Sequence, residues 1–155
     1  MRITLAAIGR LGRTPEAELA RDWAERATVQ GRALGLGPVD ILEVEPRKPG
    51  KAAEGQALLE AVGEGCWIVA CDEHGQVFPS RAFAERIGRL RDDGERRLVF
   101  LIGGADGHGH EVLARANLKL AFGPQTWPHA LARAMLAEQV YRAATILGGS
   151  PYHRD

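Results

Sequence analysis

Short apolar runs alternate with longer segments of helical pattern, and this alternation constrains the fold of the chain more than any other feature. Residues 3–8, 66–71 and 97–102 form runs that are apolar at nearly every position. Such runs are typical of strands that are buried on both faces of a parallel sheet. Two further strands are expected at residues 39–44 and 118–122. The sequence therefore predicts an α/β fold, with a mainly parallel sheet flanked by helices.

Helix signals lie between these runs. Thr14 and Pro15 stand before Glu16 and Glu18, which predicts a helix with a capping residue, a proline and acidic groups in its first turn. Further helices are expected at residues 52–62, 80–93 and 110–116. A last, long helix is expected after the turn-rich segment that ends at Pro128, running through Leu131, Met135, Val140 and Ala144. The last of these is apolar on several sides, which indicates burial against two surfaces. One surface is expected to be the chain's own sheet, and the other a second copy of the chain.

Length and charge limit the classes of protein that fit. A chain of 155 residues has room for one domain, which we expect to span residues 1–155. Lys and Arg together number 20, as do Asp and Glu, so the formal net charge is zero. This balance disfavours a free nucleic-acid-binding protein that relies on many phosphate contacts, and it predicts no DNA partner. It leaves room for a local basic patch at Arg47, Lys48 and Lys51, which is either a solvated loop or a set of RNA contacts.

The sequence shows no signal for secretion or membrane insertion. The apolar run after Met1 is too short for a signal peptide, and no segment approaches the length of a membrane span. We therefore predict a cytoplasmic protein. Cys66 and Cys71 are too few for a closed metal site and are interpreted as buried thiols, so no metal is predicted.

Three segments rich in turn-forming residues follow predicted strands, namely residues 72–75, 103–107 and 123–128. Ligands of parallel sheets bind beyond the carboxyl ends of the strands, so these segments predict a small-molecule site. Gly103, Gly104 and Gly107 allow a ligand to approach the backbone closely. A purely structural turn explains the glycines equally well, because the spacing fits neither a Walker motif nor a dinucleotide fingerprint.

Several separated motifs together resemble one known family. They are Leu101-Ile102-Gly103-Gly104-x-x-Gly107, Thr126-x-x-His129, Arg133, Glu138-Gln139-x-Tyr141-Arg142-Ala143 and Pro151-Tyr152-His153-Arg154. Over the whole chain the sequence is similar to the RlmH family of SPOUT-class methyltransferases. The resemblance implies a homodimeric SPOUT α/β knot, with a C-terminal trefoil knot. It also implies transfer of a methyl group from S-adenosylmethionine to N3 of a pseudouridine in 23S ribosomal RNA of the large subunit.

The resemblance also assigns site residues. The cofactor positions it implies are Cys71, Gly103, Gly104, Phe122, Gly123, Pro124, Gln125, Thr126, Trp127 and Pro128. Many members of the family carry leucine where Cys71 stands and methionine where Gln125 stands. These departures concern side-chain contacts more than backbone contacts. Thr126 is also a candidate cap for the last helix.

The catalytic set implied by the resemblance is His129, Arg133, Arg142, Tyr152, His153 and Arg154. Tyr152 is expected to stack on a base, and His153 and Arg154 to meet a phosphate or a base edge. Arg133 is expected to contact a phosphate or to hold the carboxylates of the tail. The general base stays open between four groups, namely His129, Glu138, His153 and Asp155.

Two other functions remain open. A non-catalytic nucleotide-binding module, which regulates or assembles other molecules, would keep the glycine loops and need no special tail. A phosphate-ester hydrolase would need a nucleophile or paired carboxylates after a strand, and only Asp72 fits that position. For the tail itself, a frayed polar end is the alternative to a functional segment.

Overall fold

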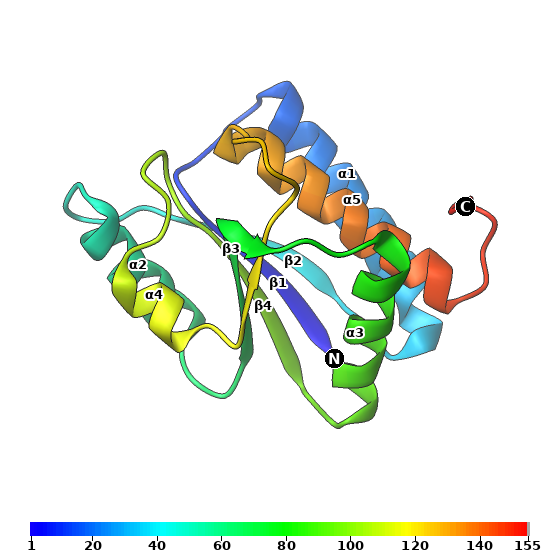
Figure 1. Ribbon diagram of the computed structural model, residues 1–155. Helices are drawn as coiled ribbons and strands as arrows, with labels where there is room; N and C mark the ends of the chain where they lie inside the picture. The colour runs from blue at the N-terminus through cyan, green and yellow to red at the C-terminus, as the bar shows by residue number, and fades with distance from the viewer. Residues whose placement is uncertain (155) are drawn as a thin grey trace.

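A parallel sheet forms the centre of the computed structural model, which describes residues 1–154 (Figure 1). Its strand order is β2–β1–β4–β3–β5, and every pairing is parallel. The strands are β1 (Arg2–Ile8), β2 (Val39–Val44), β3 (Trp67–Gln76), β4 (Arg97–Ile102) and β5 (Leu118–Leu120). The predicted α/β fold with a parallel sheet is therefore confirmed. The threading of a trefoil knot stays a prediction from the resemblance.

Helices cover both faces of this sheet (Figure 1). One face carries α1 (Pro15–Gly31), α3 (Ser80–Asp92) and α5 (His129–Leu147), and the other carries α2 (Lys51–Val62) and α4 (His110–Arg115). A short 3-10 helix, η1 (Arg32–Leu34), follows α1. The start of α1 is as predicted, because the side chain of Thr14 accepts a hydrogen bond from the Ala17 N–H and Pro15 occupies the first turn.

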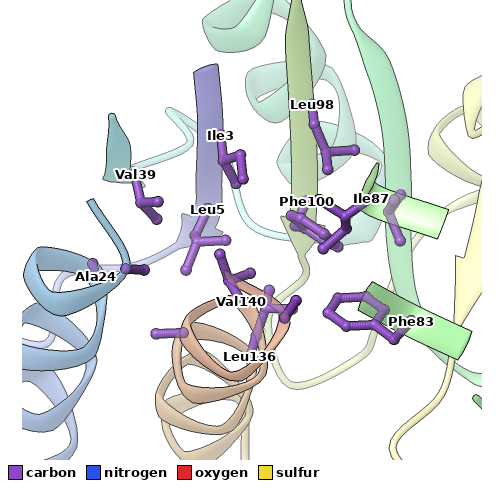
Figure 2. Packing of buried hydrophobic residues seen from close by; sticks show 14 of the residues in the cluster. Ile3, Leu5, Ala24, Val39, Phe83, Ile87, Leu98, Phe100, Leu136 and Val140 are labelled. Atoms are coloured by element: carbon purple, nitrogen blue, oxygen red, sulfur yellow. The ribbon is translucent and has the colours of Figure 1, made fainter. Parts of the chain in front are cut away.

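The core lies on both sides of the central strands. Toward α1, α3 and α5 the strands direct Leu5 and Phe100, which meet Leu136 of α5 and Phe83 of α3 (Figure 2). On the opposite face, Ala6, Ile68, Val99 and Leu101 of the strands pack against Leu58 of α2 and Val112 of α4. Successive residues of a strand point to opposite faces, so a strand covered on both sides must be apolar throughout. This explains the continuous apolar runs.

The segment from Asp72 to Gly75 differs from its prediction. It was expected as a loop beyond the third strand, but β3 continues to Gln76 and the segment is a bulge within it. Leu120 of β5 pairs first with Cys71 and then with Gln76, so the intervening residues leave the ladder. The chain can return because Gly75 lies directly against the backbone of Leu120. β5 also ends at Leu120, two residues earlier than expected.

The connections after β3 and β4 leave the sheet on opposite faces. β3 leads to α3, on the face of α1 and α5, while its neighbour β4 leads to α4, on the face of α2. Where connections of adjacent parallel strands diverge in this way, a crevice opens at the carboxyl edge of the sheet. The fold therefore places its most favourable ligand position at the ends of β3 and β4.

Substituting Gly75→Ala tests the close approach that closes the bulge. An added Cβ would come within 2.7 Å of backbone atoms of Leu120 and Lys119, which cannot move away as a flexible side chain could. We expect the free energy of unfolding in urea to fall by about 1–3 kcal/mol, as for other overpacked sites. His74→Ala is the matched control in the same bulge, because its side chain is 86% exposed. Equal unfolding midpoints for the two variants would contradict the assigned role of Gly75.

Candidate functional site

A cavity of about 460 Å³ opens at the carboxyl edge of the sheet, where β3, β4 and β5 end. Three segments form most of its wall: the β3 bulge, the loop after β4 and the loop after β5. Its volume lies within the range of about 300–1,000 Å³ that is typical of small-molecule sites. Gly104 and Thr126, which come from two of these segments, both line the cavity. The sequence-based expectation that the three segments converge is therefore met.

Most of the residues that the resemblance assigns to a cofactor line this cavity. The lining members are Cys71, Gly103, Gly104, Phe122, Gly123, Gln125, Thr126 and Trp127. Pro124 and Pro128 are not among the lining residues. Pro128 instead immediately precedes α5 and occupies its N-cap position. The geometry brings the assigned positions together, but it does not by itself identify a ligand.

The loop after β4 is folded tightly on itself. Gly104 and Gly107 form an isolated antiparallel bridge, and the Gly107 N–H donates to the Gly104 carbonyl at 3.1 Å. A Cβ on Gly103 would lie 2.8 Å from the Gly107 carbonyl oxygen, so the turn needs a glycine there. Gly107 has a φ of 72°, which also favours glycine. The glycines thus form a compact backbone wall rather than a flexible loop.

His108 fixes this loop, a role that was not predicted from the sequence. Its side chain is 8% exposed, and its Nε2–H donates to the Leu101 carbonyl of β4 at 3.0 Å. Burial lowers the pKa of the imidazole, although this hydrogen bond and the carboxylates of Asp72 and Glu54 oppose that shift. The neutral ring therefore acts as a brace between β4 and the glycine turn. A histidine directly after Gly107 was the only available signal in the sequence.

Cys71 and Asp72 both line the β3 side of the cavity, the first with a thiol and the second with a carboxylate. Burial, followed by the nearby Asp72 carboxylate, raises the pKa of the Cys71 thiol to about 12. Cys71 is therefore a neutral, weakly polar wall and not a thiolate nucleophile. The Asp72 carboxylate accepts a hydrogen bond from the His74 N–H at 2.8 Å, which holds the turn of the bulge.

The loop after β5 is tied to the β3 bulge. Thr126 Oγ1 donates to Glu73 Oε2 at 3.1 Å, so two walls of the cavity are linked directly. The expectation that Thr126 caps the last helix is wrong. α5 begins at His129 without a side-chain cap, because the Thr126 hydroxyl is used across the cavity instead. His129 also lines the cavity and does not act as a cap.

Arg133 lies in the interior, contrary to its expected role. Its side chain is 2% exposed, and its guanidinium donates to Glu43 at 3.1 Å and to the carbonyls of Ile8 and Gly9 at the end of β1. Burial lowers the pKa of Arg133, while the Glu43 carboxylate opposes that shift. Burial of the guanidinium against β1 and β2 does not suit a phosphate contact and makes Arg133 a positioning residue in this structure. The carboxylates of Asp155 lie outside the described residues, so a contact between them and Arg133 stays a prediction.

The C-terminal tail is docked rather than frayed over the described residues. Tyr152 donates through its hydroxyl to Glu138 at 2.9 Å, and the Arg142 guanidinium lies 4.8 Å from the centroid of its ring. Arg142 also donates to Glu138, and one of its nitrogens is 3.1 Å from Nδ1 of His153. Burial and the contact with Glu138 raise the pKa of Tyr152. The ring of Tyr141 completes the cluster, at 4.8 Å between centroids.

This arrangement bears on the candidates for a general base. One oxygen of Glu138 accepts from both Tyr152 and Arg142, and the other accepts from Gln139 at 2.7 Å. Both oxygens of the Glu138 carboxylate therefore accept hydrogen bonds within the chain, and the bond from Arg142 is an i, i+4 pair. Arg154 is exposed, and Asp155 lies outside the described residues.

The described residues of the tail lie outside the cavity. His129 begins α5 beside the cavity, and the tail follows the last residue of the helix, Leu147, and turns back to Glu138 near its middle. Glu138 lies nine residues after His129 (138 − 129), which is about 14 Å along the helix at ~1.5 Å per residue. No residue from 150 to 154 lines the cavity. Within one chain, the two groups of expected functional residues therefore do not meet.

A second cavity, of about 500 Å³, lies along the first half of α5, from Leu131 to Gln139, and shares residues 120–123 with the first cavity. It is bordered mainly by apolar side chains of α1, α5 and the segment before α3. Leu19, Val77 and Leu131 on its border are 47%, 62% and 40% exposed. The side of α5 that carries Leu131 thus faces away from the sheet, as the sequence pattern predicted. A free apolar surface of this kind indicates an interaction site.

Residues 1–154 contain no candidate metal site and no candidate membrane-spanning helix. Nowhere in that range do three or more His, Cys, Asp or Glu side chains gather in a way that could hold a metal ion. Among the helices of the same range, none combines the length and hydrophobicity needed to cross a membrane.

Comparisons with known proteins agree with this architecture. The sequence family described as "Predicted SPOUT methyltransferase" matches residues 1–153. A relative from Caulobacter sp. (strain K31), named "Ribosomal RNA large subunit methyltransferase H", is 70% identical over 155 residues and covers 100% of both chains. A relative of the same name from Dinoroseobacter shibae is 51% identical and covers 99% of both chains.

Solved structures support the fold alone. A probable methylase family protein from Haemophilus influenzae superposes with a TM-score of 0.59 at 13% identity, covering 99% of this chain and 70% of that one. A probable methyltransferase from Bordetella pertussis gives a TM-score of 0.53 at 16% identity, covering 92% and 96%. The sequence family and the full-length relatives decide the assignment: this chain belongs to the SPOUT methyltransferase family.

Proposed function

We propose that the chain uses S-adenosylmethionine to methylate N3 of a pseudouridine in 23S ribosomal RNA of the large subunit. Membership of the SPOUT family makes it a methyltransferase. The choice of donor and acceptor is supported by the convergence of three backbone turns on one cavity. The chain is also 70% identical over its full length to a relative named as a ribosomal RNA large subunit methyltransferase.

The cavity suits the proposed methyl donor. Gly103 and Gly104 lack Cβ atoms and offer backbone groups that can recognise an adenosine without charged side chains. Ile102, Leu120 and Phe122 supply an apolar wall that suits an aromatic base. Carboxylates of Asp72, Glu73 and Asp106 also line the space, and they favour a cationic ligand. Bound there, S-adenosylmethionine would supply an activated methyl group on a sulfonium.

The chain's own residues have to position the acceptor. In the transfer, the sulfur–carbon bond breaks as a bond to N3 forms, and the N3 proton must leave the base. Alignment of the reacting atoms supplies much of the acceleration in such displacements. His129 lines the cavity and is placed to accept a proton there, whereas Glu138 is already occupied by Tyr152 and Arg142. His153 of the tail, whose Nδ1 lies 3.1 Å from a nitrogen of Arg142, is the other imidazole among the candidates.

A homodimer would bring the tail to the cavity. Within one chain Tyr152 is hydrogen-bonded to Glu138, about 14 Å along α5 from His129 at ~1.5 Å per residue, and the apolar second cavity borders the same part of the helix. A second copy packed antiparallel against this exposed surface could place its tail near the first chain's glycine loop. Burial of Leu19 and Leu131 would stabilise such a dimer. Tyr152, His153 and Arg154 of one subunit would then present the RNA base to the cofactor of the other.

The non-catalytic alternative has less support. A nucleotide-binding module would need the cavity but not an ordered tail in which Tyr152, Arg142 and Glu138 are bound together. The structure shows nothing that favours the hydrolase alternative either, since Asp72 serves the turn of the β3 bulge.

Substituting Gly103→Ala tests the cofactor site. The new Cβ would lie 2.8 Å from the Gly107 carbonyl oxygen and force the turn open. We expect the Kd for S-adenosylmethionine, measured by calorimetry, to rise on the order of 10-fold or more, which corresponds to ~1.4 kcal/mol or more. Gln56→Ala, on the exposed side of α2, is the control and should leave the Kd unchanged. The proposal fails if the wild-type chain shows no binding at millimolar ligand.

A mixing experiment tests the composite site. We expect both Gly103→Ala and a variant lacking residues 152–155 to be inactive on large subunits isolated from a strain that lacks the enzyme. If the tail acts in trans, a mixed dimer holds one complete site, and a 1:1 mixture should recover roughly a quarter of wild-type activity. If the site lies within one chain, the mixture stays inactive. Retention of cofactor binding by the tail deletion serves as the folding control.

The target nucleotide is tested by mass analysis of ribosomal RNA. We expect RNA from the deletion strain to lack one methyl group on a pseudouridine of 23S RNA, and the wild-type gene to restore it. The Gly103→Ala gene should restore little or none of the modification. An unchanged methylated pseudouridine in the deletion strain contradicts the substrate assignment.

A further inference from the structure

Five cationic side chains follow two neighbouring strands, and the cavity accounts for only one of them. Arg10 and Arg13 lie in the loop between β1 and α1, and Arg47, Lys48 and Lys51 lie between β2 and the first turn of α2. Because β1 and β2 are parallel, with Ile8 opposite Val44, both loops emerge at the carboxyl edge of the sheet. We call these five residues the basic ridge.

The basic ridge adjoins the cavity at that edge. Lys51 lines the cavity. In addition, β1 is the direct neighbour of β4, and the glycine turn at residues 103–107, which forms part of the cavity wall, follows β4. A direct contact also links the two loops, since Arg10 lies 3.5 Å from Glu45. The ridge therefore begins with Lys51 at the rim of the cavity, and its two loops follow β1 and β2 at the same edge of the sheet.

Positive charge is concentrated in these two loops, although the formal net charge of the whole chain is zero. Residues 9–14 and 45–51 contain five of the chain's 20 Lys and Arg residues but only one of its 20 Asp and Glu residues. All five cations are exposed. Within residues 1–154, Arg13, Arg47, Lys48 and Lys51 have no ion pair or side-chain hydrogen bond. Exposed cations that no carboxylate neutralises favour a polyanionic partner.

The backbone beneath the ridge is held in place. The Leu11 N–H donates to Glu43 Oε1 at 3.1 Å, and the same oxygen accepts from the buried Arg133. Pro46 and Pro49 restrict the second loop. The cationic side chains are flexible, but they project from anchored loops, so their positions relative to the cavity are largely set before a partner binds.

We infer that the basic ridge binds the RNA backbone beside the target nucleotide, through phosphate contacts of Arg13, Arg47 and Lys48 together with Arg10 and Lys51. This inference rests on the proposed function and adds the surface that holds the substrate. Phosphate contacts fix the orientation of a nucleic acid without reading its sequence. A base presented to the cavity needs such anchoring, because a chain of zero net charge attracts RNA only where its cations are concentrated.

The test is a triple variant, Arg13→Gln, Arg47→Gln and Lys48→Gln, compared with Arg32→Gln, Arg96→Gln and Arg115→Gln. The control residues are equally exposed and lie at the amino edge of the sheet, so both variants lose the same charge. The substrate is the isolated large ribosomal subunit from a strain that lacks the enzyme. Its KM is measured over a series of salt concentrations, and the Kd for S-adenosylmethionine is measured alongside.

We expect the ridge variant to raise the KM for subunits on the order of 10- to 100-fold at ~0.1 M salt, and to lower the slope of log affinity against log salt by about 2. The control variant should change both values much less, and cofactor Kd should stay the same in both. Equal effects of the two variants would overturn the inference. A higher KM with an unchanged salt slope would also overturn it, and would indicate a ribosomal protein as the contact.

Failure of the inference can be distinguished from failure of the proposed function. If the wild-type chain binds S-adenosylmethionine but methylates no large subunit, the substrate proposal fails and the ridge loses its basis. If the wild-type chain methylates subunits and the ridge variant does so with wild-type KM, the function stands and the ridge assignment falls.

Discussion

The buried guanidinium of Arg133 joins the parts of the molecule that have to act together. It enters from α5, one turn beyond His129 at the cavity, and donates to the last carbonyls of β1 and to Glu43 of β2. A buried cation is costly unless its hydrogen bonds replace those with water. Here Glu43 and two carbonyls do so, although Nε lacks a partner among the described residues. Glu43 also accepts from Leu11, so the same contact anchors the first loop of the basic ridge.

The docking of the tail on α5 then bears on how the proposed site is assembled. The helix carries His129 at the cavity, and the tail that follows the helix turns back, so that Tyr152 is fixed by Glu138 and Arg142. Glu138 lies nine residues after His129 (138 − 129), which is about 14 Å along the helix at ~1.5 Å per residue. A tail docked in this way stays outside the cavity of its own chain, and for this reason the proposed site takes the tail of a second chain. The exposed apolar side chains along this part of α5 lie where an antiparallel partner helix would bury them.

The sequence could predict features that depend on residues close together in the chain, but not contacts between residues far apart in it. The strands were predictable because burial on both faces leaves a local apolar signature, and Thr14 was predictable because a cap acts on its own helix. The bulge of β3 depends on Gly75 meeting the backbone of Leu120, which lies far along the chain. The roles of Thr126 and Arg133 depend on partners 53 and as many as 125 residues away. No local pattern encodes such partners, so neither the bond from Thr126 to Glu73 nor the burial of Arg133 was predicted.

Zero net charge conceals a division of charge at the carboxyl edge that fits the proposed reaction. The cavity side carries Asp72, Glu73 and Asp106, whereas the neighbouring loops carry the cations of the basic ridge. A sulfonium donor is cationic and an RNA acceptor is polyanionic, so the two substrates require opposite fields only a short distance apart. Screening limits such fields to about 8–10 Å at physiological salt, which keeps each one local. The two regions meet at Lys51, which belongs to the basic ridge and also lines the cavity, so the two proposed substrates would be held side by side at this edge.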